Sequence, residues 1–303
     1  MNRRRFMQTA LAGAPALALP WLPTKTVAQM MVGGGTLTTV SDGYLALPRS
    51  FVIGDLSEDD AVPIIEEAGY SMEDFRSPCN LAVWQKDDMT VLFDAGSGPD
   101  FMPSAGTLWD SLDAAGLTPD DITHVLMTHG HPDHIWGIID DFDEPTFYSA
   151  QHFMGGREHD YWMDPNTINT IGEARQSFAA GALRRLDIIG SDMALFGDGD
   201  EVVPGITAVA TPGHTPGHMA FRIADGGQTA LVVGDAIGNG HLALARPEWV
   251  SPADQDGATG ITTRMTLLEE LSASGETMVG FHLPEGGIGK IASVAEGYTF
   301  TPA

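Results

Sequence analysis

Cysteine is almost missing from this chain: Cys79 is the only one in 303 residues. A single cysteine excludes an internal disulfide and also a zinc site built from several cysteines. The residues on either side, Pro78 and Asn80–Val83, are typical of the entry to a strand. Because free cysteine usually behaves as a small apolar residue, we expect Cys79 to be buried in the core rather than to act as a nucleophile.

Basic residues are also scarce, with 15 lysines and arginines against 41 acidic residues and a net charge of −26. Nucleic-acid binding requires basic surface that displaces counterions, so this class of function is excluded. Anionic membranes and polyanionic substrates are disfavoured for the same reason. We interpret the acidity as favouring solubility, and we expect a small molecule as the partner. The composition neither requires nor excludes a homodimer.

A long apolar run is absent as well. Near the N-terminus, TALAGAPALALPWL follows the basic stretch RRRFM, but Gly13, Pro15 and Pro20 interrupt it, and it is too short to span a bilayer. Thr26–Ala28 offers a small-x-Ala cleavage site. We predict a twin-arginine-type export signal over residues 1–28 and a mature protein in a bacterial periplasm, with no stable membrane association after cleavage. An uncleaved anchor or a chance basic tail is the alternative.

The rest of the chain, with 43% hydrophobic residues, predicts a globular α/β protein. We expect a linker or first hairpin at 29–44 and a single domain at 45–303. The predicted helices lie at 104–115, 166–186 and 261–273. The predicted strands lie at 45–53, 80–84, 90–93, 122–127, 146–148, 206–210, 219–223, 230–233 and 278–281. Several of these strands end at a histidine or aspartate, near 129, 214, 235 and 282. Strand ends are where α/β proteins gather their active sites.

The densest of these ends is THGHPDH at 128–134. In extended backbone, residues two apart point the same way, so His129, His131 and Asp133 can converge. His134 follows at the start of a predicted helix and can point to a second position. Neutral imidazole and carboxylate are common zinc ligands, and two ions about 3.5–4 Å apart can share a carboxylate. The cluster therefore predicts a metal site.

The other histidines carry less information. We expect His124, His152, His159 and His241 to be ordinary core or surface residues. His218, in PGHTPGH, could instead orient a metal ligand from behind.

Four segments, taken in order, resemble the signature of the metallo-β-lactamase-fold hydrolases. They are HGHPDH at 129–134, His214 in TPGHTPGH, Asp235 in VVGDA and His282 in GFHLP. FDAG at 93–96 resembles a loop of the same family. The resemblance covers roughly residues 45–300. It implies a four-layer αββα sandwich with mixed sheets and with metals at the rim between the sheets.

The resemblance also implies a ligand set. His129, His131 and His214 would hold one divalent ion, Asp133, His134 and His282 would hold the other, and Asp235 would bridge them. Zinc is the expected metal, and manganese, iron or cobalt are alternatives because His/Asp sites accept several ions. A water between two dications loses a proton near neutral pH and can attack a carbonyl carbon or a phosphorus centre. Asp133 and Asp235 are the expected catalytic residues, with Asp133 taking the proton of the nucleophile.

Asp235 favours the glyoxalase II, lactonase and phosphoester-cleaving branches, because β-lactamases of this fold generally lack it. Three C-terminal segments resemble the subgroup of methyl parathion hydrolase and the N-acyl-homoserine lactonases: ARPEWV at 245–250, HLPEGGIGKI at 282–291 and EGYTFTP at 296–302. One departure is Gly238, where some of those lactonases carry a tyrosine that assists at the substrate carbonyl.

We therefore predict an exported, dinuclear metal-dependent hydrolase of a small ester, lactone or phosphotriester. The alternatives are a glyoxalase-II-like thioesterase, a β-lactam hydrolase and a mononuclear iron persulfide dioxygenase. The thioesterase usually gathers basic residues around glutathione, and Lys290 is one local exception to their scarcity here. A diiron oxygen reductase usually adds a flavodoxin-like domain, for which the chain has no room. A non-catalytic protein on the same scaffold would usually have lost ligands.

Overall fold

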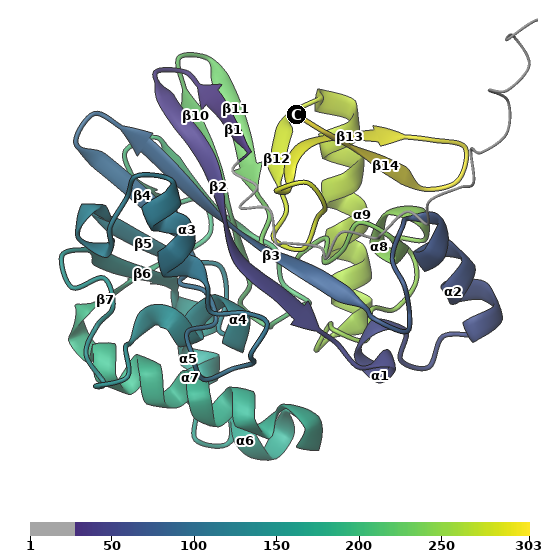
Figure 1. Ribbon diagram of the computed structural model, residues 1–303, viewed down its shortest axis with the longest axis horizontal. Coiled ribbons are helices and arrows are strands. Elements are labelled where there is room, and N and C mark those ends of the chain that lie inside the picture. The colour runs from purple at the N-terminus through teal and green to yellow at the C-terminus, as the bar shows by residue number, and fades with distance from the viewer. Residues whose placement is uncertain (1–27) are drawn as a thin grey trace, which may run out of the picture.

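Two seven-stranded sheets face each other in the computed structural model, which describes residues 28–303 (Figure 1). The predicted export signal therefore lies, apart from Ala28, outside the described residues. The chain uses all strands of the first sheet, in the order β1 to β7, before it enters the second sheet. The second sheet is ordered β14 to β8, so each sheet is built from one half of the chain.

Both sheets are mixed. In the first, β1 to β4 are antiparallel and β4 to β7 are parallel. In the second, β11 and β12 are parallel and the other neighbours are antiparallel. The strands of the first sheet are β1 (Gln29–Val32), β2 (Gly35–Ala46), β3 (Arg76–Lys86), β4 (Met89–Phe93), β5 (His124–Met127), β6 (Gln151–Gly155) and β7 (Met193–Phe196). Those of the second are β8 (Glu201–Val203), β9 (Ile206–Ala210), β10 (Met219–Asp225), β11 (Gln228–Val232), β12 (Thr277–Val279), β13 (Ile288–Ser293) and β14 (Tyr298–Pro302).

The strand period of two assigns side chains to the layers. On β4, Val91 and Phe93 enter the core between the sheets, while Leu92 faces the outer helices. On β3, Trp84 faces inward and Val83 outward in the same way. Strands buried on both faces have almost no polar positions, which explains the continuous apolar runs in the sequence.

Helices cover the outer faces of both sheets. Outside the first sheet lie α3 (Leu108–Ala114), α4 (Pro132–Ile135), α5 (Gly156–Met163), α6 (Thr167–Thr170) and α7 (Gln176–Ile189). Outside the second lie α8 (Leu242–Ala245) and α9 (Gly257–Ser274), and α1 (Arg49–Val52) and α2 (Glu58–Glu67) pack beside α8 (Figure 1). These layers confirm the predicted four-layer αββα sandwich. No helix among residues 28–303 is both long and apolar enough to cross a bilayer.

Four element predictions are wrong or incomplete. Residues 49–52 form α1 rather than the end of a strand, because Pro48 cannot donate to the sheet ladder and instead stands as the N-cap of this helix. The strand expected at 146–148 is instead β6 at Gln151–Gly155, which pairs with β5. The helix expected at 166–186 is divided into α6 and α7.

The fourth concerns the helix expected at 104–115. It begins at Leu108, whose amide donates to the Asp42 carboxylate of β2 at 2.8 Å, so the cap comes from a distant strand rather than from Ser104.

Candidate metal centre

All seven residues that the sequence marks as ligands lie together at one end of the two sheets and are buried. The loop after β5 and the short helix α4 carry His129, His131, Asp133 and His134. The loop between β9 and β10 carries His214. Asp235 follows β11 and His282 follows β12. The end of each apolar strand thus delivers its polar residue to one place.

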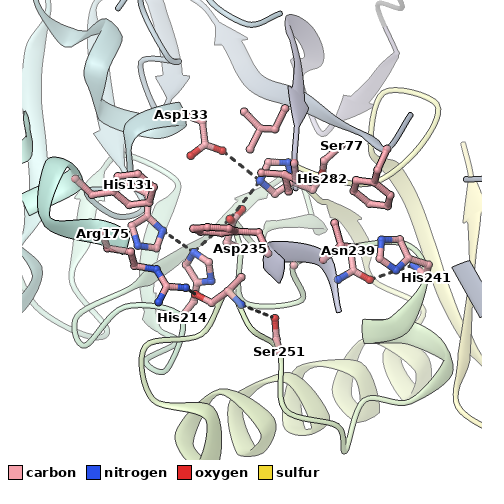
Figure 2. A pocket seen from close by; sticks show the side chains of 18 of the residues that line it. Ser77, His131, Asp133, Arg175, His214, Asp235, Asn239, His241, Ser251 and His282 are labelled. Atoms are coloured by element: carbon pink, nitrogen blue, oxygen red, sulfur yellow. Dashed lines mark hydrogen bonds and ion pairs between the residues drawn. The ribbon is translucent and has the colours of Figure 1, made fainter. Parts of the chain in front are cut away.

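The first set of ligand atoms, which we name the histidine group, comprises His129, His131 and His214. His129 Nε2 lies 3.1 Å from His131 Nδ1, and His131 Nδ1 lies 2.8 Å from His214 Nε2. Figure 2 shows the rings of His131 and His214 directed at each other. Nitrogen lone pairs that converge in this way repel unless a cation or a proton lies between them.

The second set, the mixed group, comprises Asp133, His134, Asp235 and His282. Asp133 Oδ2 lies 3.4 Å from His134 Nε2 and 3.2 Å from His282 Nε2. Asp235 Oδ1 lies 3.4 Å from His134 Nε2, and its Oδ2 lies 3.3 Å from His282 Nε2 (Figure 2). Ligands at 2.0–2.1 Å from a tetrahedral zinc ion are about 3.3 Å apart, so this spacing fits one ion.

Asp235 connects the two groups. Its Oδ2 lies 3.3 Å from His214 Nε2 of the histidine group and 3.3 Å from His282 Nε2 of the mixed group. Asp133 Oδ2, His134 Nε2 and Asp235 Oδ1 are buried and have no hydrogen-bond partner among the described residues. Buried polar atoms without a partner are costly, and a cation held by the mixed group would satisfy all three. The geometry supports a dinuclear metal centre.

Hydrogen-bond partners behind His134 and His282 fix which nitrogen of each ring faces the centre. His134 Nδ1 lies 2.8 Å from the Asp94 carboxylate, and His282 Nδ1 lies 2.7 Å from the Pro78 carbonyl. The Pro78 carbonyl and an ionised Asp94 carboxylate only accept hydrogen bonds, so each imidazole carries a proton on Nδ1. This directs Nε2 at the centre, where it can bind a metal ion after losing any proton of its own.

The histidine group has comparable supports. His129 Nδ1 lies 3.0 Å from Thr128 Oγ1, and His131 Nε2 lies 3.2 Å from the Gln255 amide. His214 Nδ1 makes no hydrogen bond within the described residues, but the Asp254 carboxylate lies 3.4 Å from it. Asp254 also pairs with the buried Arg264 at 3.1 Å. These supports come from both halves of the chain.

His218 supports the centre from behind. Its Nε2 accepts the backbone N–H of Asp235 at 3.0 Å, and its Nδ1 lies 2.7 Å from Thr211 Oγ1. Burial lowers the pKa of His218 well below its ordinary value, so the ring stays neutral and can accept at Nε2. His218 thus orients the loop that carries Asp235, the role that its position in the sequence suggested.

The two groups differ in their titration. Burial and the neighbouring imidazoles hold the pKa values of His129 and His131 well below the ordinary value. Burial also acts to lower the pKa values of His134 and His282, but the attraction of the carboxylates outweighs it and holds them well above the ordinary value. In return, these imidazoles overcome the effect of burial on Asp133 and Asp235 and lower their pKa values.

A cavity of about 110 Å³ opens onto both groups, and His131, Asp133, His214, Asp235 and His282 form its floor (Figure 2). One part of its wall is apolar and consists of Leu45, Leu47, Phe51, Val52, Phe75, Phe101 and Phe178. Its other polar residues are Ser77, Arg175, Asn239, His241 and Ser251. Arg175 is held there by bonds from Nη2 to the Pro252 and Ala253 carbonyls, at 2.7 and 3.2 Å.

The remaining residues singled out in the sequence are not ligands, although His241 and Gly238 line the cavity. His124, His152, His159 and His241 belong to neither ligand group. Cys79 is fully buried, which confirms the prediction, and burial raises the pKa of its thiol to about 12. Lys290 is exposed on β13 and does not line the cavity. Gly238 does line it, with a φ of +85° that disfavours a tyrosine.

Sequence reasoning missed several supports. Asp94 lies in the FDAG segment, so that motif held a signal. Asp254, Gln255 and Arg175 stand in no recognisable motif, and only the packing of the loop at 251–256 against the histidine group reveals them.

Comparison with known proteins agrees with this geometry. Residues 75–282 match the family described as the Metallo-beta-lactamase superfamily. An uncharacterised protein of Mycobacterium tuberculosis (strain ATCC 25618 / H37Rv) is 30% identical over 206 residues, which cover 63% of this chain and 82% of the relative. The N-acyl homoserine lactonase AttM of Azorhizobium caulinodans is 30% identical over 134 residues, which cover 42% of this chain and 46% of the lactonase.

Two solved structures share the fold at 23% identity. AidC, a dizinc quorum-quenching lactonase in complex with a product, superposes with a TM-score of 0.86 and covers 91% of this chain and 97% of its own. The hydrolase AbOPH of the beta-lactamase superfamily superposes with a TM-score of 0.84 and covers 92% and 97%. With the family match over residues 75–282 and the two ligand groups in place, the chain belongs to the metallo-β-lactamase superfamily and is a metal-dependent hydrolase of that superfamily.

Proposed function

We propose that this protein is an exported hydrolase with two metal ions that opens a small, uncharged lactone or cleaves a related ester or phosphotriester. The observation that carries the proposal is the cavity, whose floor holds residues of both ligand groups and whose wall is mostly apolar. Such a cavity favours a substrate with an apolar portion and one polar reacting centre. The named lactonases AttM and AidC, to which the chain is similar, support this substrate class.

The residues divide the work in this proposal. His129, His131 and His214 would hold one ion, Asp133, His134 and His282 the other, and Asp235 would bridge them. Such ions, most simply zinc, supply Lewis acidity and lower the pKa of bound water. Asp133 Oδ2 lies at the cavity floor without a hydrogen-bond partner among the described residues, so it is placed to orient the attacking water and accept its proton.

Polar groups around the opening would orient the substrate. The guanidinium of Arg175 lies beside the histidine group, and its Nε is buried without a partner among residues 28–303. Asn239 accepts the amides of His241 and Ala243 through Oδ1, at 3.2 and 3.0 Å, so its NH₂ group remains available as a donor. These donors suit the carbonyl or phosphoryl oxygen of an uncharged substrate.

The test combines metal analysis with a substrate panel. Purified protein should contain about two divalent ions per chain, and a chelator should abolish activity that zinc, manganese or cobalt restores. We expect turnover of lactones, aryl esters or phosphotriesters. Activity confined to thioesters or to β-lactams, or a single iron with persulfide oxidation, would reject the proposed substrate class in favour of the corresponding alternative.

Export is tested separately. The full chain should be processed near Gln29 and recovered from the periplasm, and replacement of the arginines at 3–5 by lysine should retain it in the cytoplasm. A chain that stays cytoplasmic with its arginines intact would overturn this part of the proposal.

A further inference from the structure

Helix α5 packs against both loops that carry the histidine group. Its residue Glu158 is fully buried and receives four hydrogen bonds. Oε1 accepts the Gly130 N–H at 3.0 Å and the Trp162 indole N–H at 2.6 Å. Oε2 accepts the Thr215 hydroxyl at 2.8 Å and the Gly217 N–H at 2.9 Å. One carboxylate is thus saturated with donors from three segments of the chain.

Two of these segments are the ligand loops themselves. Gly130 lies between His129 and His131, in the loop after β5 of the first sheet. Thr215 directly follows His214, in the loop before β10 of the second sheet. Glu158 touches no ligand side chain, yet it ties together the backbones that bring all three imidazoles to one point.

The glycines in the two loops allow this contact. A Cβ atom on Gly130 would overlap the indole of Trp162, and one on Gly217 would overlap the backbone of Glu158. Either change would push α5 away from the loops. Close packing against α5 therefore explains why glycine stands beside the histidines at Gly130 and Gly217.

Charge makes the arrangement selective for a carboxylate. All four partners of Glu158 are uncharged donors, and an ionised carboxylate accepts from all of them. A glutamine of the same shape would direct its NH₂ group at existing N–H donors on either side. Only the Thr215 hydroxyl could turn to accept from it.

We propose that Glu158 is a positioning residue that sets the spacing between His129 and His131 on one loop and His214 on the other, so that the three imidazoles close on a single divalent ion. The inference rests on the dinuclear centre of the proposed function, but not on its substrate. Residues that support metal ligands from behind typically contribute about 10–100-fold to metal affinity.

The experiment is a zinc titration of chelator-stripped full-length protein against a chromophoric competitor, which resolves two binding steps. His129→Ala identifies the step that belongs to the histidine group. Glu158→Gln should weaken that step about 10–100-fold and leave the other within about twofold. The control Asp225→Asn removes a carboxylate that joins the two sheets through Lys86 and the Gly34 amide. It should lower thermal stability and leave both steps unchanged.

A second variant covers the case in which Glu158→Gln does not fold. Thr215→Val removes one of the four bonds and should weaken the same step by a smaller factor, about 3–10-fold. Both steps unchanged, or both weakened equally, would overturn the proposal, because a purely structural role predicts no selectivity. A wild-type protein that takes up one ion would overturn the dinuclear centre itself. Two ions without any ester or lactone hydrolysis would reject only the proposed substrate class.

Discussion

The histidine group and the mixed group lie side by side but differ in charge. The histidine group offers three imidazoles, and burial holds the pKa values of His129 and His131 well below the ordinary value. The mixed group surrounds two imidazoles with the carboxylates of Asp133 and Asp235, and Asp94 adds a third carboxylate behind His134. The Asp235 carboxylate lies 3.3 Å from a ligand nitrogen of each group.

The two groups therefore attract a cation in different ways. The mixed group has a strong electrostatic attraction, but in the metal-free protein its imidazoles bind protons that compete with the metal. The histidine group has no carboxylate among its ligands, and Asp254 behind His214 is paired with Arg264, so this group depends more on the geometry that Glu158 and the supporting loops impose. Four experiments test this contrast between the groups.

The largest effect should come from breaking the link between the groups. Asp235→Ala removes the carboxylate that lies 3.3 Å from ligand nitrogens of both groups. We expect kcat/KM to fall at least about 1,000-fold, or about 4 kcal/mol of transition-state stabilisation. Steady-state kinetics with the best substrate of the panel measures the change. Asp160→Ala, at an 84% exposed side chain, is the control and should leave kcat/KM unchanged. Normal turnover by Asp235→Ala would refute the bridging role.

Removal of the ions should destabilise the whole protein. An ion present at about 1,000 times its Kd stabilises the folded state by about 4 kcal/mol, which for a chain of this size corresponds to a fall in Tm of about 8–16 °C on chelation. Scanning calorimetry with and without chelator measures it. In His129→Ala, chelation should still lower Tm, but only by the part that comes from the ion held by the mixed group. An unchanged Tm after verified metal removal would mean that the centre contributes nothing to folding.

pH should separate the groups most directly. The pKa values of His134 and His282 are raised, so these residues hold protons below those values and a metal must displace them. Affinity at the mixed group should rise with pH, about tenfold per unit for each displaced proton, or about 100-fold from pH 6 to pH 8 for one. His129 and His131 have lowered pKa values and no proton to release in this range, so affinity at the histidine group should rise less steeply with pH than affinity at the mixed group. Competition titrations at pH 6, 7 and 8 with equal slopes for both steps would contradict this.

The smallest effect should come from the charge beside the histidine group. Arg175→Met removes a cation from the cavity wall while keeping the length of the side chain. We expect KM to rise about tenfold, or about 1.4 kcal/mol, with little change in kcat and in metal content. Arg157, which is exposed on α5 and does not line the cavity, supplies the control Arg157→Met. If both variants behave like the wild type, Arg175 does not contact the substrate.

The sequence was informative where the chemistry is local. Residues 129–134 carry four ligand-type side chains in six positions, which predicts a metal site. The period of two places His129 and His131 together, but Asp133 lies on α4 and joins the mixed group instead. The other three ligands were marked by motifs at strand ends, and the structure brings all of them to the same place.

The sequence does not indicate the residues and elements whose position depends on tertiary packing. Glu158 lies on α5 and Gln255 in a loop of the other half, and nothing near them in the sequence indicates contact with the ligand loops. The segment at 49–53 has the β-branched and aromatic composition of a strand, yet Pro48 and burial of Val52 against Ile65 and Phe75 make it a helix. Strands β13 and β14 were not predicted at all, because their identity depends on pairing with each other and with β12.

The chain passes from the first sheet to the second once, through the exposed loop at 197–200 between β7 and β8. Each ligand group draws residues from both sides of that loop: His129 and His131 with His214, and Asp133 and His134 with Asp235 and His282. A protein cut at this loop would therefore yield two fragments of which neither holds a complete ligand set. A metal ion would bind only the reassembled pair of fragments, so their association would become stronger as the zinc concentration rises.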